Sequence, residues 1–156
     1  MYRIQKTDYT CGPVAIWNAC VHITGKRPKT TLRKLLSECK TTEYGTYPWD
    51  LSSKESIHRS KRPIFNIQVI LYSLESFILL YSFDEGMLHY VFVVKHTTSA
   101  SSESKYMVYN DYDPVKDNYE HKEYTEVEFK RKFFRSEYRP CGMDYPQAWV
   151  VTSTPQ

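Results

Sequence analysis

The stretch from Cys11 to Thr24 constrains the fold most, because it is apolar on nearly every side of the helix that it predicts. Its apolar residues after Cys11 are Val14, Ala15, Ile16, Trp17, Ala19, Val21 and Ile23. Gly25 follows, at the position where a glycine commonly ends a helix. A helix that is hydrophobic all round is a buried one. We therefore expect a central helix that other elements cover.

The composition is that of one ordinary globular domain. The chain has 156 residues, of which 41% are hydrophobic and 25% are charged, enough apolar material for a core and too much for a disordered chain. We expect a single domain over residues 1–156. The net charge is +3, without the strong basic bias of nucleic-acid-binding proteins. No nucleic-acid partner is expected.

The sequence also bears on compartment and membrane. The first eight residues contain no apolar run like that of a signal peptide, and the four cysteines form no Cys-x-x-Cys pair. These observations predict a cytoplasmic protein with reduced thiols and no metal or other cofactor. Residues 64–83 are apolar enough to suggest a membrane span, but Asn66, Gln68 and Glu75 interrupt them. Two short buried elements explain the stretch better, so we expect no membrane partner.

Four further helices are indicated. Thr31 is placed to cap a helix whose inner face carries Leu32, Leu35 and Leu36. A polar, turn-rich segment, a short helix after Pro48 and a basic loop up to Pro63 follow, and residues 65–72 predict another helix. The pair Thr125 and Glu128 matches a capping box. The apolar side of the helix behind it is expected to consist of Val127, Phe133 and Phe134.

The strand signals lie in the second half of the chain. Four runs rich in β-branched and aromatic residues predict strands at 76–83, 89–94, 106–110 and 148–152. A turn at 84–86 and a Ser/Thr-rich loop at 97–104 separate the first three, and the loop is long enough to border a site. Helices first and an antiparallel sheet second predict an α+β fold.

Cys11 is the first candidate for chemistry. At the start of a helix, unsatisfied N–H groups and the helix dipole favour a negative charge. Such an environment lowers a thiol pKa from about 8.5 to between about 3.5 and 7.5 and makes a nucleophile. Gly12 leaves room for an approaching substrate, and Pro13 suits the first helical turn. Cys20 points to the opposite side of the helix. The alternative is a buried structural cysteine.

Gln5 lies six residues before Cys11. Its side-chain amide could reach the helix start and, with the Cys11 backbone N–H, form an oxyanion hole for a tetrahedral intermediate. A surface glutamine near the N-terminus is the alternative reading.

The segment Gln5-Lys-Thr-Asp-Tyr-Thr-Cys11-Gly12-Pro13 resembles the active-site entry of papain-like cysteine peptidases. It is most similar to the bacteriocin-processing (double-glycine leader) peptidases and their stand-alone relatives. The similarity continues through the expected helix at 31–36 and the Gly-Thr turn at Gly45. It also covers residues 88–94, where the family has a catalytic histidine opening a strand, and 106–111, where a strand delivers the third catalytic residue. About residues 1 to 135 are covered.

The resemblance implies a papain-like fold with a Cys11, His89 and Asp111 triad and Gln5 as oxyanion donor. His89 would exchange a proton with the thiol and then with the leaving amine. Asp111 matches the third position of the family. Asp113, which precedes a proline as the family residue often does, is the alternative, because residues two apart on a strand face the same way. Asn110 would face the opposite side.

The expected activity is hydrolysis of a peptide or isopeptide bond in a peptide or protein substrate. By resemblance, the cleavage site is Gly-Gly-like. Gly12, Tyr90 and Asp113 are expected on the substrate side of the site. Two alternatives stay open at this point. The same triad serves deamidases, transglutaminases and deubiquitinase-like isopeptidases, and the fold could also be an inactive peptide-binding module.

Overall fold

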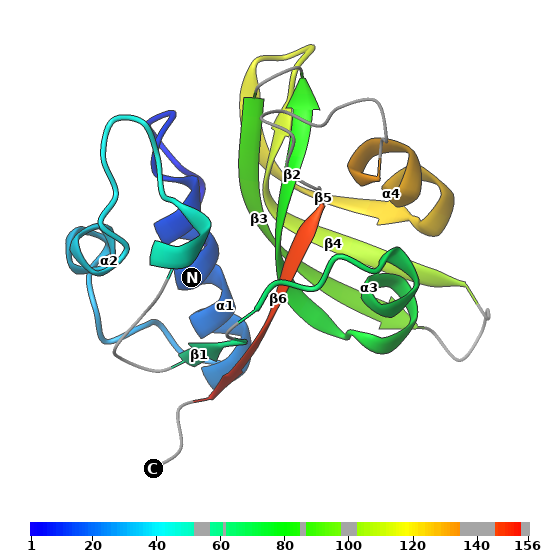
Figure 1. Cartoon of the computed structure of the whole chain (residues 1–156), viewed down its shortest axis with the longest axis horizontal. Coiled ribbons are helices and arrows are strands. Elements are labelled where there is room, and N and C mark those ends of the chain that lie inside the picture. The colour runs from blue at the N-terminus through cyan, green and yellow to red at the C-terminus, as the bar shows by residue number, and fades with distance from the viewer. Residues whose placement is uncertain (52–56, 61, 85–86, 98–102, 135–145, 154–156) are drawn as a thin grey trace.

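An antiparallel sheet runs through the middle of the molecule, with helices on both of its faces (Figure 1). The structure is a computed structural model that describes residues 1–51, 57–60, 62–84, 87–97, 103–134 and 146–153. Within these residues the sheet has six strands in the order β1-β6-β2-β3-β4-β5. Their bounds are β1 Ile57–Arg59, β2 Ser76–Asp84, β3 Met87–Thr97, β4 Ser104–Asp113, β5 Asn118–Thr125 and β6 Gln147–Ser153.

The helices divide between the two faces of the sheet. On one face lie α1 (Cys11–Thr24), α2 (Leu32–Glu38) and the short 3-10 helix η1 (Pro48–Asp50). On the other lie α3 (Ile67–Ser73) and α4 (Glu126–Phe133) (Figure 1). An antiparallel sheet with helices packed on it belongs to the α+β class, which confirms that part of the predicted fold.

The first helix is as buried as its sequence predicts. Every residue from Cys11 to Val21 is buried. The helix ends at Gly25, which has a φ of 68° and donates its N–H to the Val21 carbonyl at 2.9 Å. Left-handed backbone of this kind favours glycine because it has no Cβ.

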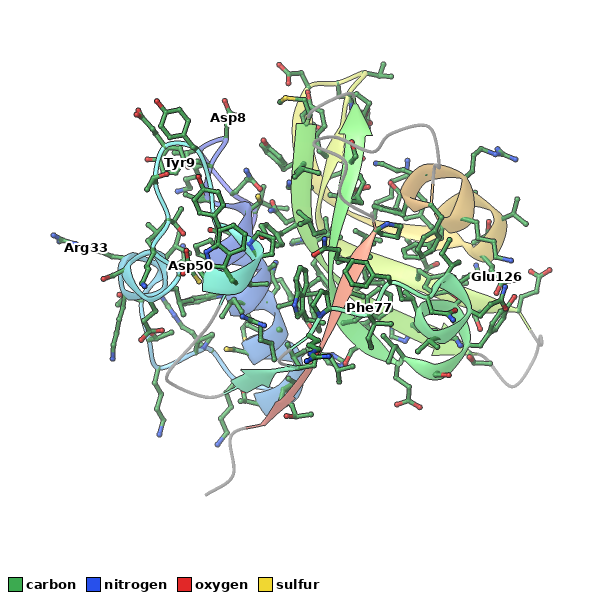
Figure 2. All side chains as sticks on the ribbon, in the orientation of Figure 1. Asp8, Tyr9, Arg33, Asp50, Phe77 and Glu126 are labelled. Carbon is green, nitrogen blue, oxygen red and sulfur yellow. The ribbon has the colours of Figure 1, made fainter. Side chains whose placement is uncertain are left out.

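Side chains alternate between the two faces of each strand, so the sheet has one hydrophobic core on each face. Side chains of one parity, including Leu80, Phe92 and Trp149, pack with α1. Side chains of the other parity pack with α3 and α4, and Figure 2 shows Phe77 among them, between the sheet and α3. Because successive strand residues face opposite sides, neighbouring residues of β3 serve different cores.

Most predicted elements are present, and three details differ. The expected basic loop contains β1, and β5 occupies a segment for which no strand was expected. In α4 the capping box at Thr125 and Glu128 forms. However, Val127 is 63% exposed, and the buried residue is Phe129. The expected turn at 84–86 and loop at 97–104 lie mostly outside the described residues, as does Cys141.

The apolar segment 64–83 resolves into α3 followed by β2, as predicted. Among the described residues, no helix combines the length and the apolar character that crossing a membrane requires.

Candidate functional site

Cys11 lies in the wall of a cleft between the α1 side and the start of β3. The cleft has a volume of about 500 Å³. Its walls come from Asp8 and Tyr9 before the helix, from residues 43–49, and from the β2–β3 hairpin, which contributes Leu88 and Tyr90. Figure 2 shows Asp8 and Tyr9 beside the loop that leads to η1. The fold therefore brings three separate segments of the chain around one thiol.

The Cys11 sulfur faces three backbone N–H groups, those of Cys11, Gly12 and Tyr90. Each favours the thiolate, but the side chain is only 7% exposed. Burial disfavours the charged form, and it raises the pKa of the Cys11 thiol above its ordinary value. The prediction of a lowered thiol pKa is therefore wrong. The loss of solvation raises the pKa by more than the backbone N–H groups at the helix start lower it.

His89 is the residue before Tyr90, on the opposite face of β3. Its Nε2 lies 2.7 Å from the Asn110 carbonyl oxygen. A carbonyl only accepts, so Nε2 carries the hydrogen and Nδ1 carries the lone pair in the neutral ring. Burial lowers the pKa of His89 to about 4. The imidazole is therefore neutral at pH 7, in the protonation state that a general base requires.

Two tyrosine rings enclose the imidazole. The Tyr119 ring centroid lies 5.4 Å from that of His89, and the Tyr81 ring meets it edge-on at 5.9 Å. Tyr119 also lies close enough to Cys11 for a thiolate there to raise the pKa of its phenol. The Tyr119 ring thus packs on the imidazole and lies within electrostatic range of the thiol.

Asn110 links the histidine to the N-terminal segment, a role that the sequence analysis missed. It has a φ of 65° and lies in the irregular part of the β4–β5 pairing. Its carbonyl accepts from His89, while its side chain accepts from the Gln5 N–H at 2.8 Å and donates to Gln5 Oε1 at 2.6 Å. Asparagine tolerates left-handed backbone, which was the signal available in the sequence.

Gln5 is buried and held next to the start of α1. Its Nε2 donates to the Thr7 carbonyl at 2.7 Å, and the same carbonyl accepts from the hydroxyl of Thr10, the residue before the helix. One amide hydrogen of Gln5 is thus used inside the protein. An amide nitrogen carries two hydrogens, and the second is the candidate oxyanion donor.

The Asp111 carboxylate belongs to a buried network on the α4 side of the sheet. It accepts from the hydroxyls of Tyr81, at 2.9 Å, and Tyr124, and from Lys132 Nζ at 2.7 Å. The Nε2 hydrogen bond of His89 goes to the main-chain carbonyl of Asn110. Asp111 acts on His89 through its charge, which raises the pKa of that ring, while Lys132 lowers it.

Asp113, the alternative third residue, stabilises a turn. Its carboxylate accepts from the backbone N–H of Val115 at 2.9 Å and of Lys116 at 3.2 Å. These hydrogen bonds lower the pKa of the Asp113 carboxyl. Among the residues expected on the substrate side, Tyr90 lines the Cys11 cleft, whereas Asp113 lines a different hollow beside Lys132.

Gly12 is required by packing within the protein. A Cβ on this residue would lie 2.7 Å from Thr46 Oγ1 and 2.9 Å from Thr46 Cβ. The Thr46 hydroxyl is itself within 2.7 Å of the Thr41 hydroxyl. The space above Gly12 that was expected to admit a substrate is thus occupied by Thr46.

We expect Gly12→Ala to lower the free energy of unfolding by about 1–3 kcal/mol, the usual effect of overpacking. Urea denaturation measures it. The control is the same substitution in a Thr46→Gly background, where the clash is absent. There it should be neutral or slightly stabilising, because alanine is the better helix former. Equal destabilisation in both backgrounds would contradict the contact.

The comparisons with known proteins add no relative to this geometry. The chain matches no model of a protein family, no curated protein and no solved structure. The structure alone therefore describes the class of this protein. It is an α+β protein with a cysteine at the start of a buried helix, and the strand beside that helix carries a buried neutral histidine.

Proposed function

We propose that this protein is a cysteine peptidase with a papain-like fold that hydrolyses peptide or isopeptide bonds. The observation that carries the proposal is the position of Cys11. Its sulfur lines a cleft of about 500 Å³ and faces the N–H of Tyr90, the residue that follows His89 on β3. The base that acyl transfer requires is His89, one residue before Tyr90 on the strand beside the thiol, and the proposed reaction needs its ring to reach the Cys11 sulfur.

The reaction starts from a neutral pair, because the thiol pKa is raised and the imidazole pKa is about 4. As the Cys11 sulfur attacks the carbonyl carbon, its proton passes to His89 Nδ1. The imidazolium keeps its Nε2–H on the Asn110 carbonyl and gives the new proton to the leaving amine. Water, deprotonated by the same ring, then hydrolyses the thioester and restores the thiol.

The tetrahedral intermediate needs hydrogen-bond donors for its oxyanion. The N–H of Cys11, at the start of the helix, is one candidate, since it already faces the sulfur. The second amide hydrogen of Gln5 is the other. Each such donor typically stabilises the transition state by a few kcal/mol.

The natural substrate is a peptide or a protein, and the proposed setting is the cytoplasm. The catalytic sulfur is a thiol in this structure, and reducing compartments keep thiols in that form. The Gly-Gly-like cleavage site suggested by the sequence stays a prediction.

The proposal is tested by cleavage of a randomised pool of internally quenched peptides between pH 3 and 9, with new termini identified by mass spectrometry. His89 must be neutral to accept the proton. Since its pKa is about 4, kcat/KM should be high from about pH 5 to 8 and fall about tenfold per unit below pH 4. His89→Ala should lose most of this activity.

Iodoacetamide provides the control for the resting state, because it reacts with the thiolate. For a neutral pair, alkylation of Cys11 should still rise with pH above 8. A rate that is already maximal at pH 6 would contradict the neutral pair and indicate a preformed ion pair. Cys39, which is fully buried, should react more slowly throughout.

A second function is favoured by the same burial. The raised pKa of Cys11 and the internal hydrogen bonds of Gln5 and Asp111 would also suit a peptide-binding module without catalysis. It predicts peptides that bind in the cleft and remain intact. If glutamine side chains of the pool become glutamate instead, the deamidase alternative gains.

A further inference from the structure

The Cys11 cleft is acidic although the chain as a whole is basic. The net charge of the sequence is +3, yet the charged side chains that line the described part of the cleft, Asp8 and Glu43, are both carboxylates. Both are solvent-exposed. Asp8 comes from the segment before α1 and Glu43 from the loop that precedes η1. We call these two carboxylates the acidic wall. A ligand in the cleft is thus close to two negative charges.

The same cleft presents aromatic rings to solvent. Tyr47 and Trp49 are 57% and 67% exposed, and their rings stack with centroids 4.8 Å apart and planes 6° from parallel. Tyr44 is exposed as well. Exposed large apolar side chains that gather at a concave site mark a surface that binds something. Flat π-faces beside carboxylates favour a cation with an extended, partly apolar stem.

Asp8 also lies near the reacting groups. Its Oδ1 is 3.5 Å from the Tyr119 hydroxyl, and the Tyr119 ring packs on the His89 ring. A side chain bound by Asp8 would therefore belong to a residue next to the bond that Cys11 attacks. This places the acidic wall within the substrate-binding part of the site.

We propose that the cleft selects substrates with a basic side chain next to the scissile bond, arginine in preference to lysine. The inference rests on the proposed peptidase function and names its substrate class. Arginine is preferred because its planar guanidinium stacks on aromatic faces and pairs with carboxylates in a fixed fork, whereas the lysine ammonium is compact and strongly hydrated.

The test uses tripeptidyl fluoromethyl ketones that differ in one residue: arginine, lysine, citrulline or glutamate, at the last or the penultimate position. The Cys11 sulfur displaces fluoride and forms a thioether, which mass spectrometry counts. Citrulline has the shape of arginine without its charge. We expect the arginine probe to react about tenfold faster than the citrulline probe at one of the two positions, and the glutamate probe to be slowest.

Three variants assign the effect. Asp8→Asn and Glu43→Gln should each reduce the ratio of arginine to citrulline rates about threefold, as expected for exposed ion pairs. Trp49→Ala should reduce the preference for arginine over lysine. The matched control is Glu126→Gln, a half-buried glutamate at the start of α4 on the other face of the sheet (Figure 2), which should leave the ratio unchanged.

Each rate is divided by the iodoacetamide rate of the same variant, so that a change in thiol reactivity is not mistaken for a change in selection. Equal arginine and citrulline rates at both positions would overturn the substrate class while leaving the peptidase proposal intact. For each probe, the rate with Cys11 is divided by the rate with a simple thiol, and the same ratio is measured for iodoacetamide. If no probe has a larger ratio than iodoacetamide, the peptidase proposal itself fails. A faster glutamate probe would overturn the role of the acidic wall.

Discussion

Cys11→Ala is expected to abolish cleavage of the peptide pool, with a rate at least about 10³-fold below that of the wild type. The sulfur is the atom that forms the acyl-enzyme, and a methyl group in its place cannot attack a carbonyl. Backbone donors and peptide binding would remain, so the residual rate should be that of water attacking a bound peptide. Fluorescence from the quenched pool, followed for hours at pH 7, measures the difference.

The matched control is Cys20→Ala, on the same helix. Cys20 is fully buried in the core that α1 forms with the sheet, so its loss leaves a small cavity at a distance from the cleft. We expect this variant to unfold at somewhat lower urea concentration and to cleave the pool at a rate close to that of the wild type. Cleavage that survives in Cys11→Ala would exclude this thiol as the nucleophile. A peptide that binds both proteins and is cleaved by neither would support the binding module.

The sequence predicted those parts of the fold whose signals are local. The helix at Cys11–Thr24 is marked by a continuous apolar run and by Gly25, and α4 by its capping box at Thr125. The strands β2 and β3 are dense in buried apolar side chains. Such patterns depend on residues within one or two turns of each other, so they can be recognised without knowledge of the rest of the chain.

The strand β5 carries no such signal. Its residues run Asn-Tyr-Glu-His-Lys-Glu-Tyr-Thr, and Tyr124 alone among them is buried. It lies at the edge of the sheet, where one face and one edge are open to water, and alternation of apolar residues is not required there. The three-residue β1 at the opposite edge is too short for a periodic pattern. Val127 was misplaced because the buried face of α4 depends on how the helix packs against the sheet.

For the candidate site too, local features were predictable and features set by long-range packing were not. The resemblance implied a common site for Gln5, Cys11 and His89. The fold places Gln5 and Cys11 at the start of α1 and His89 near the start of β3. The protonation states were not predictable, because burial depends on the packing of distant segments. The left-handed backbone of Asn110 was not expected either, because an asparagine alone does not say where the pairing of β4 with β5 becomes irregular. That irregularity lets the Asn110 carbonyl receive the His89 hydrogen bond.

Asp111→Ala is expected to destabilise the protein by about 3–5 kcal/mol, the usual result of removing one partner from a buried ion pair. Asp111 is 1% exposed, and Lys132 is only 24% exposed. Without the carboxylate, the lysine ammonium and the hydroxyls of Tyr81 and Tyr124 would lose a common acceptor. Urea denaturation at pH 7 measures the change. For a domain with a typical stability of about 5–15 kcal/mol, it would leave part of the protein unfolded.

Two further variants separate the buried pair from a role in catalysis. Asp111→Ala combined with Lys132→Met should recover part of the stability, because no unpaired charge is then left behind. Asp113→Ala, at an exposed turn on the same strand, should lose less than about 1 kcal/mol. If Asp111 acts mainly by holding the sheet against α4, the double variant should cleave peptides at a rate within about tenfold of the wild type when it is folded. A folded double variant that loses activity as completely as Cys11→Ala would instead show that the carboxylate is part of the catalytic machinery, with its charge acting on His89.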